Sequence, residues 1–280
     1  MQVNLEEKPK TYVVINPVAG VSQLEVVRAR IQAALDQREI PCEFYETTGK
    51  EDLRQMVRDK VKAGFKLFIS AGGDGTLSSV IDGLVDADVP LVIIPTGTWN
   101  ALARALDIPL QLEQAVDLLF KEHDIHIIDA MQVADDYSVL SISAGAGSLT
   151  MKEVEREQKR RWGKLADLKS AVTQLLKFRS YRFEVRIDGT LSRFRASELM
   201  VANSSILGIK ALQLDPNIRM DDGKLNVCRI YANNVGDYLR LAVGMLTGGR
   251  RRSWNILCLE ASEEVEIRCR EKLPVQGDGD

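Results

Sequence analysis

The first 122 residues alternate short, continuous apolar runs with stretches of helical periodicity, and this alternation constrains the fold most strongly. Apolar runs cover residues 12–15, 67–69 and 91–94, and apolar residues recur at helical spacing over residues 23–37 and 53–61. A strand that is buried on both faces is apolar throughout, whereas a strand with one solvent face alternates. The order of strands and helices therefore predicts an α/β domain whose parallel sheet is covered by helices.

The pattern changes after residue 122. Residues 181–187 and 193–201 alternate polar and apolar side chains, and Asp188-Gly189 between them is a hairpin signal. Alternation of this kind is typical of strands that pair antiparallel and expose one face. We therefore predict an α/β domain over residues 1–122 and a mostly antiparallel β domain with inserted helices over residues 123–280.

Composition limits the classes of partner. The chain has 280 residues and a formal net charge of −3, which argues against a protein that binds nucleic acid through bulk charge. The N-terminus lacks the apolar segment of a signal peptide, and no apolar run reaches the ~18 residues that a membrane span needs. We expect a cytoplasmic protein that can lie peripheral to a membrane. The oligomeric state stays open, and a homodimer is one alternative.

The four cysteines and two histidines suggest no zinc site. The cysteines form no C-x-x-C pair, so we expect four reduced, mostly buried thiols. His123 and His126 have no cysteine or histidine partner at the spacing of a zinc site.

A glycine-rich turn, Gly72–Thr76, follows one apolar run and begins a helix. The unpaired N–H groups of a helix start attract phosphate, and glycines let the backbone approach it closely. The carboxylate of Asp74 would repel phosphate unless a divalent cation lay between them, which points to Mg²⁺. The alternative is that Asp74 caps the helix and that the glycines only make a tight turn.

A second turn of this kind, Pro95–Asn100, follows the run at residues 91–94 and leads into another helix. Two such turns on neighbouring parallel strands form a phosphate crevice at the carboxyl edge of the sheet. Neither the Walker sequence nor the dinucleotide fingerprint G-x-G-x-x-G is present.

These turns, together with three other motifs, resemble the diacylglycerol kinase catalytic-domain family, which includes bacterial lipid kinases, sphingosine kinases and ceramide kinases. The resemblance runs from about Tyr12 to Asp280, nearly the whole chain. The G-G-D-G-T turn alone is shared with NAD kinases, but its combination with P-x-G-T-x-N is more specific. The motifs are Asn16-Pro17, Thr47, Gly72-Gly73-Asp74-Gly75-Thr76, Pro95-x-Gly97-Thr98-x-Asn100 and Asp222-Gly223-x-Leu225.

The resemblance implies a Rossmann-like first domain, a β-sandwich second domain, and transfer of the γ-phosphate of ATP to a lipid hydroxyl, a step of phospholipid metabolism. It implies a structural Mg²⁺ site, to which Asp222 would supply its carboxylate and Arg219 and Lys224 their backbone carbonyls. Asp278 and Asp280 match the family's D-G-E motif, and the carboxylate at position 280 would accept the hydroxyl proton. The implied nucleotide contacts are Asn16, Thr47, Gly72, Gly73, Asp74, Gly75, Thr76, Leu77, Ser78, Thr98 and Asn100.

The sequence also departs from the family pattern. Ala101 stands where many bacterial members carry an aspartate, as it does in sphingosine kinases, and Asp280 replaces a glutamate. Most members continue past this last motif, so we expect a truncated chain. Two alternatives to a lipid kinase therefore stay open: an NAD kinase, and a nucleotide-binding regulatory protein with impaired catalysis.

Residues 151–182 suggest contact with an anionic membrane surface. They hold ten Lys or Arg against four Asp or Glu, and leucines recur at helical spacing within them. A basic amphipathic helix can dock on anionic headgroups. Residues 249–254 form a second basic patch with a tryptophan. The alternatives are an ordinary helix packed on the β domain and a solvated loop.

Overall fold

A computed structural model of the chain describes residues 5–17, 21–121, 125–145, 180–206, 214–234, 236–237, 240–241, 243 and 255–278. Most of the basic stretch 151–182, the whole patch 249–254 and Asp280 lie outside these residues. The chain divides into two compact units, Met1–Ser138 and Val139–Asp280. Within the described ranges, no helix is both long and apolar enough to cross a bilayer.

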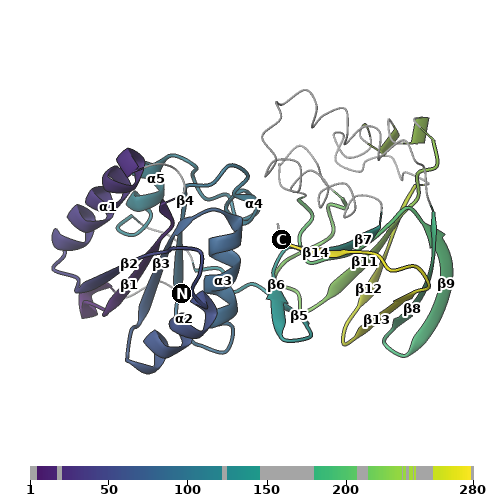
Figure 1. Cartoon of the computed structure of the whole chain (residues 1–280), viewed down its shortest axis with the longest axis horizontal. Helices are drawn as coiled ribbons and strands as arrows, with labels where there is room; N and C mark the ends of the chain where they lie inside the picture. The colour runs from purple at the N-terminus through teal and green to yellow at the C-terminus, as the bar shows by residue number, and fades with distance from the viewer. Residues whose placement is uncertain are drawn as a thin grey trace. The chain divides into compact units, whose positions relative to one another are not determined.

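The first unit contains a four-stranded parallel sheet in the order β2-β1-β3-β4 (Figure 1). Every residue of β1 and β3 is buried, which explains why these strands are mostly apolar, with Thr11 and Ser70 as the polar exceptions. The predicted α/β domain with a parallel sheet is therefore confirmed. The strands are β1 (Thr11–Ile15), β2 (Cys42–Glu46), β3 (Leu67–Gly72) and β4 (Leu91–Pro95). The helices are η1 (Leu5–Glu7), α1 (Val21–Asp36), α2 (Leu53–Lys62), α3 (Asp74–Leu84), α4 (Ala101–Ala105) and α5 (Leu112–Asp117).

The sheet buries a different apolar cluster on each face. Side chains alternate along β1, so Val13 and Ile15 pack into the cluster that includes residues of α1 and α5. Tyr12 and Val14 pack into the opposite cluster with residues of α2 and α3. The layers thus hold the carboxyl ends of the strands, where the predicted site lies, on a rigid support.

Helices α2 and α3 approach so closely that one position must be glycine. A Cβ on Gly83 would lie 2.6 Å from Cβ of Val57 and 2.8 Å from the carbonyl oxygen of Arg54. Gly83→Ala should therefore destabilise the protein by about 1–3 kcal/mol, as overpacking does. Urea unfolding measures this change. Ser79→Ala, which adds no new atom to the same helix, should shift stability by less than about 0.5 kcal/mol.

A more stable Gly83→Ala protein would also be informative, because alanine has a higher helix propensity than glycine. If α2 and α3 were not in tight contact, Gly83→Ala would stabilise α3 by up to about 1 kcal/mol. A stabilised Gly83→Ala protein would therefore contradict the observed packing.

A short hairpin completes the first unit. It consists of β5 (Met131–Val133) and β6 (Asp136–Ser138), and it is tied to α2 by Arg54. The Arg54 guanidinium binds the carboxylate of Asp136 and, at 3.1 Å, that of Asp82 in α3. Burial raises the pKa of Asp82, and the nearby Arg54 opposes this rise. Arg54 therefore links three elements of the first unit.

The second unit is an antiparallel sandwich of two sheets, in the orders β12-β11-β10-β7-β14 and β13-β8-β9 (Figure 1). Leu199 and Val227 of the larger sheet pack against Tyr181, Phe183 and Val185 of the smaller one. The predicted β-sandwich is therefore confirmed. The strands are β7 (Ser141–Gly145), β8 (Tyr181–Ile187), β9 (Thr190–Ala196), β10 (Glu198–Ala202), β11 (Leu225–Ile230), β12 (Ile256–Ala261), β13 (Val265–Cys269) and β14 (Val275–Gly277).

The expectation of four reduced thiols is wrong for one pair. Cys228 of β11 and Cys258 of β12 form a disulfide, with their Cα atoms 4.0 Å apart. The two residues stand directly opposite each other in the register of the two antiparallel strands. Their separation of 30 residues in the sequence does not reveal this pairing. Cys42 and Cys269 are free and half-buried.

Candidate functional site

The two glycine turns lie against each other at the carboxyl edge of the first sheet. Strands β3 and β4 are neighbours, and the N–H of Thr96 donates to the carbonyl of Gly72 at 3.1 Å. A Cβ on Gly97 would lie only 2.5 Å from Cα of Gly73. The sequence predicted that the turns would meet, and the backbones are in fact close enough that position 97 depends on glycine.

Asp74 caps a helix, but not the helix that it begins. Its Oδ1 accepts a hydrogen bond at 2.6 Å from the N–H of Ala101, the first residue of α4. The N-cap of α3 itself is Gly73, which has no side chain to offer. In the part of the chain that the structure describes, Oδ2 of Asp74 accepts no hydrogen bond. The carboxylate thus links the two turns through Oδ1, and Oδ2 can still bind a ligand.

Asn100 holds the second turn in shape. Its backbone is left-handed, with φ of 48°. Its side chain accepts from the N–H of Gly97 at 2.9 Å and donates to the carbonyl of Gly97 at 2.7 Å. Asn100 is buried, whereas Thr98 and Trp99 at the tip of the turn are exposed. Thr98 is therefore accessible to a ligand, and Asn100 shapes the loop that presents it.

Residues after β1 and β2 join the same edge. Asn16 follows β1, and its Nδ2 donates to Oγ1 of Thr76 in the first turn of α3 at 2.7 Å. Thr47 follows β2, is buried, and donates its N–H to the carbonyl of Ile15 at 2.9 Å. Leu77 points into the core, and Ser78 is half-buried. The structure thus places these predicted residues at the ends of neighbouring strands or in the first turn of α3.

Sequence reasoning missed the role of Glu51, which braces the turn after Thr47. Its carboxylate accepts from the N–H and hydroxyl of Thr48 and from the N–H of Lys50. The hydrogen bond from Thr48 is the main cause that lowers the pKa of Glu51 to about 2. The T-x-x-E spacing of Thr48 and Glu51 is the sequence signal that could have indicated this brace.

The edge can receive a metal ion only together with a ligand that supplies further oxygens. The described ranges contain no group of three or more His, Cys, Asp or Glu side chains placed to hold a metal. Mg²⁺ is commonly bound through one or two carboxylates plus phosphate oxygens and water. The remaining oxygen of Asp74 fits such a shared site, beside two helix starts whose first N–H groups lack partners within the helix.

The three predicted metal residues of the second unit fall within one turn before β11. Oδ1 of Asp222 accepts from the N–H of Lys224 at 3.0 Å, and Gly223 between them has φ of +68°. The guanidinium of Arg219 binds Asp221, a neighbour that the sequence analysis did not single out, at 3.0 and 3.1 Å. The turn therefore brings the three residues together without assigning them a ligand.

Asp278 has the contacts of a positioning residue. Its carboxylate accepts hydrogen bonds from the N–H groups of Val139, Leu140 and Ser141, the last two at 3.0 Å. These contacts join the end of β14 to the segment that leads into β7, within the second unit. A carboxylate with three backbone donors is committed to this contact. Asp280, which the sequence analysis made the base, lies outside the described residues.

Comparison with family models divides the chain in two. The model of the diacylglycerol kinase catalytic domain matches residues 10–133. The model of the YegS C-terminal NAD kinase beta sandwich-like domain matches residues 140–280. The two matches fall on the two compact units that the structure shows.

Several curated proteins and solved structures are similar over most of the chain. Diacylglycerol kinase of Bacillus subtilis is 27% identical, over 96% of this chain and 88% of its own length. The "Probable lipid kinase YegS-like" protein of Pseudomonas fluorescens is 27% identical, over 82% of this chain and 75% of its own length. A solved diacylglycerol kinase from Bacillus anthracis str. Sterne is 21% identical with a TM-score of 0.72, and the match covers 96% of this chain and 89% of that one. At this identity the structural likeness concerns the fold.

Proposed function

Because this chain belongs to the diacylglycerol kinase catalytic-domain family, we propose that it is an Mg²⁺-dependent kinase that transfers the γ-phosphate of ATP to the hydroxyl of a lipid. Its relatives make a phosphotransferase the expected class. That the nucleotide is ATP, that the metal ion is Mg²⁺ and that the acceptor is a lipid are our additions to this class.

The observation that carries the proposal is the contact between the two glycine turns. Gly73 and Gly97 pack backbone to backbone, so the helix starts of α3 and α4 lie side by side. Phosphoryl transfer depends mainly on positioning and on compensating phosphate charge. Two adjacent helix starts supply N–H donors for a phosphate chain, and the exposed hydroxyl of Thr98 adds a further donor at the tip.

The acidic residues have separate roles in this proposal. Asp74 holds one end of α4 with Oδ1 and offers Oδ2 to Mg²⁺ or to its water shell. When bound, Mg²⁺ neutralises charge on the phosphate oxygens. Asp278 fixes the segment around Val139, and Asp280 accepts the proton of the attacking hydroxyl.

A panel of acceptors tests the proposal. The chain is incubated with γ-labelled ATP, Mg²⁺ and mixed micelles of diacylglycerol, sphingosine, ceramide or phosphatidylglycerol, and NAD is added as a soluble acceptor. We expect label in one of the lipids. Label in NAD alone would replace the lipid kinase with an NAD kinase.

A catalytically impaired regulatory protein is the second candidate, and Ala101 favours it. Ala101 offers only its backbone N–H to Asp74, where many bacterial members have a second carboxylate. Mg²⁺-dependent ATP binding without label in any acceptor, both for this chain and for one extended at its C-terminus, would establish this candidate.

We predict that the Asp222 turn binds Mg²⁺. Addition of saturating Mg²⁺ should raise the Tm by roughly 2–4 °C, which corresponds to about 1 kcal/mol of binding to the folded state. Asp222→Ala should remove this increment. Asp221→Ala, which breaks the ion pair with Arg219 and keeps the carboxylate of Asp222, is the matched control and should keep the increment. An equal Mg²⁺ response in Asp222→Ala and in the unmodified protein would exclude the site.

A further inference from the structure

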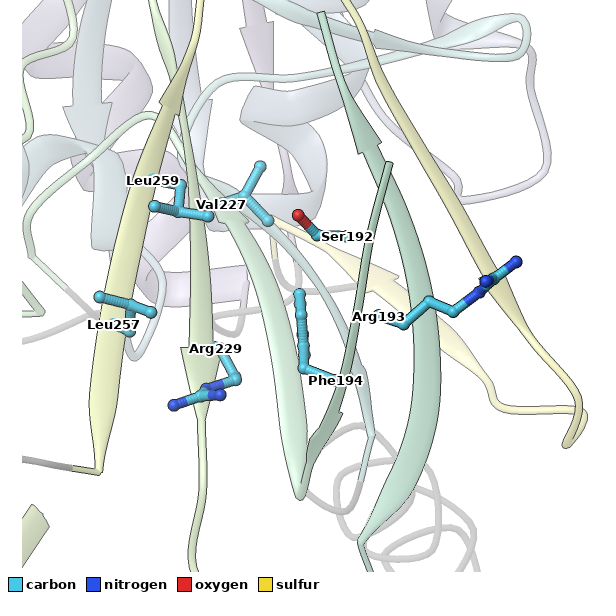
Figure 2. A pocket seen from close by; sticks show the side chains of 7 residues that line it. All are labelled: Ser192, Arg193, Phe194, Val227, Arg229, Leu257 and Leu259. Atoms are coloured by element: carbon cyan, nitrogen blue, oxygen red, sulfur yellow. The ribbon is translucent and has the colours of Figure 1, made fainter. Parts of the chain in front are cut away.

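The sandwich of the second unit contains a cavity of about 300 Å³ that none of the predicted site residues lines. Figure 2 shows side chains from three strands around it: β9, β11 and β12. The residues are Ser192, Arg193, Phe194, Val227, Arg229, Leu257 and Leu259. The cavity lies wholly inside one unit, so its walls are fixed by the strand pairing of β11 with β12 and by the packing between the two sheets.

One wall of the cavity is apolar and open to solvent. Leu257 and Leu259 of β12 are 48% and 41% exposed, although both lie on the face of the larger sheet that carries the buried Val227. The intervening Cys258 packs on the opposite face. Two large aliphatic side chains that remain exposed beside a hollow form an apolar surface for a ligand to cover.

The second distinctive feature of the cavity lining is the guanidinium of Arg229, a cation that forms no ion pair within the described ranges. Nε of Arg229 is buried, and within the described ranges its N–H donates to no acceptor and no carboxylate pairs with its guanidinium. Its recorded contact is with the ring of Phe194, whose centroid lies 5.7 Å from Cζ. Arg229 as a whole is half-buried, so the cost falls on its Nε–H, which has lost water without gaining an acceptor, and the cation–π contact offsets only part of that cost.

The neighbouring arginine shows that this situation is specific to Arg229. Arg193 also borders the cavity, but its Nε donates to Glu184 at 2.8 Å. Figure 2 shows its side chain directed away from Phe194 and Arg229. The cavity therefore contains one uncompensated positive charge next to an apolar wall.

We propose that this cavity binds a single-chain amphiphile with a carboxylate head, that is, a long-chain fatty acid anion. The carboxylate would form a bidentate pair with the guanidinium of Arg229, and the chain would cover Leu257 and Leu259. A monoanion matches one guanidinium, whereas a phosphate dianion would leave charge unpaired because Arg193 is held by Glu184. A volume at the lower end of ligand pockets suits one chain and not two.

This inference does not depend on the proposed kinase activity, because it uses none of the residues of the glycine turns. Isothermal titration of the full chain with dodecanoate, below its critical micelle concentration, tests it. We expect saturable binding with one site. Acetate, which lacks the chain, and 1-dodecanol, which lacks the charge, should each bind at least about tenfold more weakly.

Matched variants identify the site. Arg229→Met keeps an unbranched apolar stem and removes the guanidinium with its charge, so it should weaken dodecanoate binding by about tenfold to a hundredfold, the equivalent of one charge-assisted hydrogen bond. Arg193→Met, at the same cavity, should leave binding unchanged. Arg229→Lys should bind more tightly than Arg229→Met, and circular dichroism checks that each variant is folded.

Three results would overturn the proposal. One is the absence of dodecanoate binding to the unmodified chain. Another is equal affinity for dodecanoate in the unmodified chain and in folded Arg229→Met, which would mean non-specific adsorption of the alkyl chain. The last is tighter binding of dodecyl phosphate than of dodecanoate, which would rule out the carboxylate as the preferred head.

Discussion

Asp74→Asn should lower the rate of phosphoryl transfer by about 10²–10³-fold, because it removes the charge that we propose Asp74 offers to Mg²⁺ and the phosphates. The protein should stay folded, since the amide oxygen of asparagine can still accept the hydrogen bond from Ala101 that Oδ1 now accepts. The measurement is label transfer from ATP to the acceptor identified in the panel, together with ATP affinity at several Mg²⁺ concentrations.

Two further variants separate the charge from the cap. Asp74→Ala removes both the charge and the oxygen that caps α4. It should therefore lose activity and also lower the free energy of unfolding by about 1 kcal/mol, the usual cost of a lost cap. Asp88→Asn changes an exposed aspartate in the same unit and should alter neither property. Near-normal turnover of folded Asp74→Asn would reduce Asp74 to a helix cap and remove it from the proposed chemistry.

Gly97→Ala should weaken ATP binding by at least about tenfold and destabilise the first unit by more than the ~1–3 kcal/mol of ordinary overpacking. The added Cβ would lie 2.5 Å from Cα of Gly73 and 2.9 Å from Oδ1 of Asn100. Backbone atoms cannot rotate away as a side chain can, so the two turns must separate. Titration calorimetry with ATP and urea unfolding measure the two effects.

Gly73→Ala is the graded control for this change. Its Cβ would meet Cα of Gly97 at 3.3 Å, a contact that a shift of a few tenths of an ångström relieves. It should therefore cost less stability than Gly97→Ala. The steric account fails if the order is reversed, or if Gly97→Ala binds ATP as tightly as the unmodified protein.

The sequence was sufficient to predict the layers of the fold because burial leaves a direct trace in composition. Strands β1 and β3 are buried along their whole length, so each contains a continuous apolar run, at residues 12–15 and 67–69. Strand β8 alternates buried and exposed residues, so it shows the period of a sheet with one solvent face. Both patterns are local, and reading them requires no knowledge of which strands become neighbours.

Features that depend on register could not be predicted in this way. Cys228 and Cys258 meet because β11 and β12 pair with these residues opposite each other, which the sequence separation does not encode. From the sequence, Asp74 could be interpreted either as a residue that binds a metal ion or as the cap of the helix that it begins. The observed cap on α4 requires the contact between two turns that lie more than twenty residues apart in the sequence, which only the folded backbone provides.

The hydrogen bonds between Asp278 and the segment before β7 have a consequence for how the second unit folds during its synthesis on the ribosome. The hydrogen bond from Val139 to Asp278 spans 139 positions of the chain, and β14 pairs with β7. Residues 139–145 are synthesised early, but their partner strand emerges only when translation reaches residues 275–278. Long-range pairing of this kind slows folding, and domains tend to fold in the order of their synthesis. The parallel-sheet unit can thus fold during translation, while β7 lacks one of its two partner strands until β14 has been made.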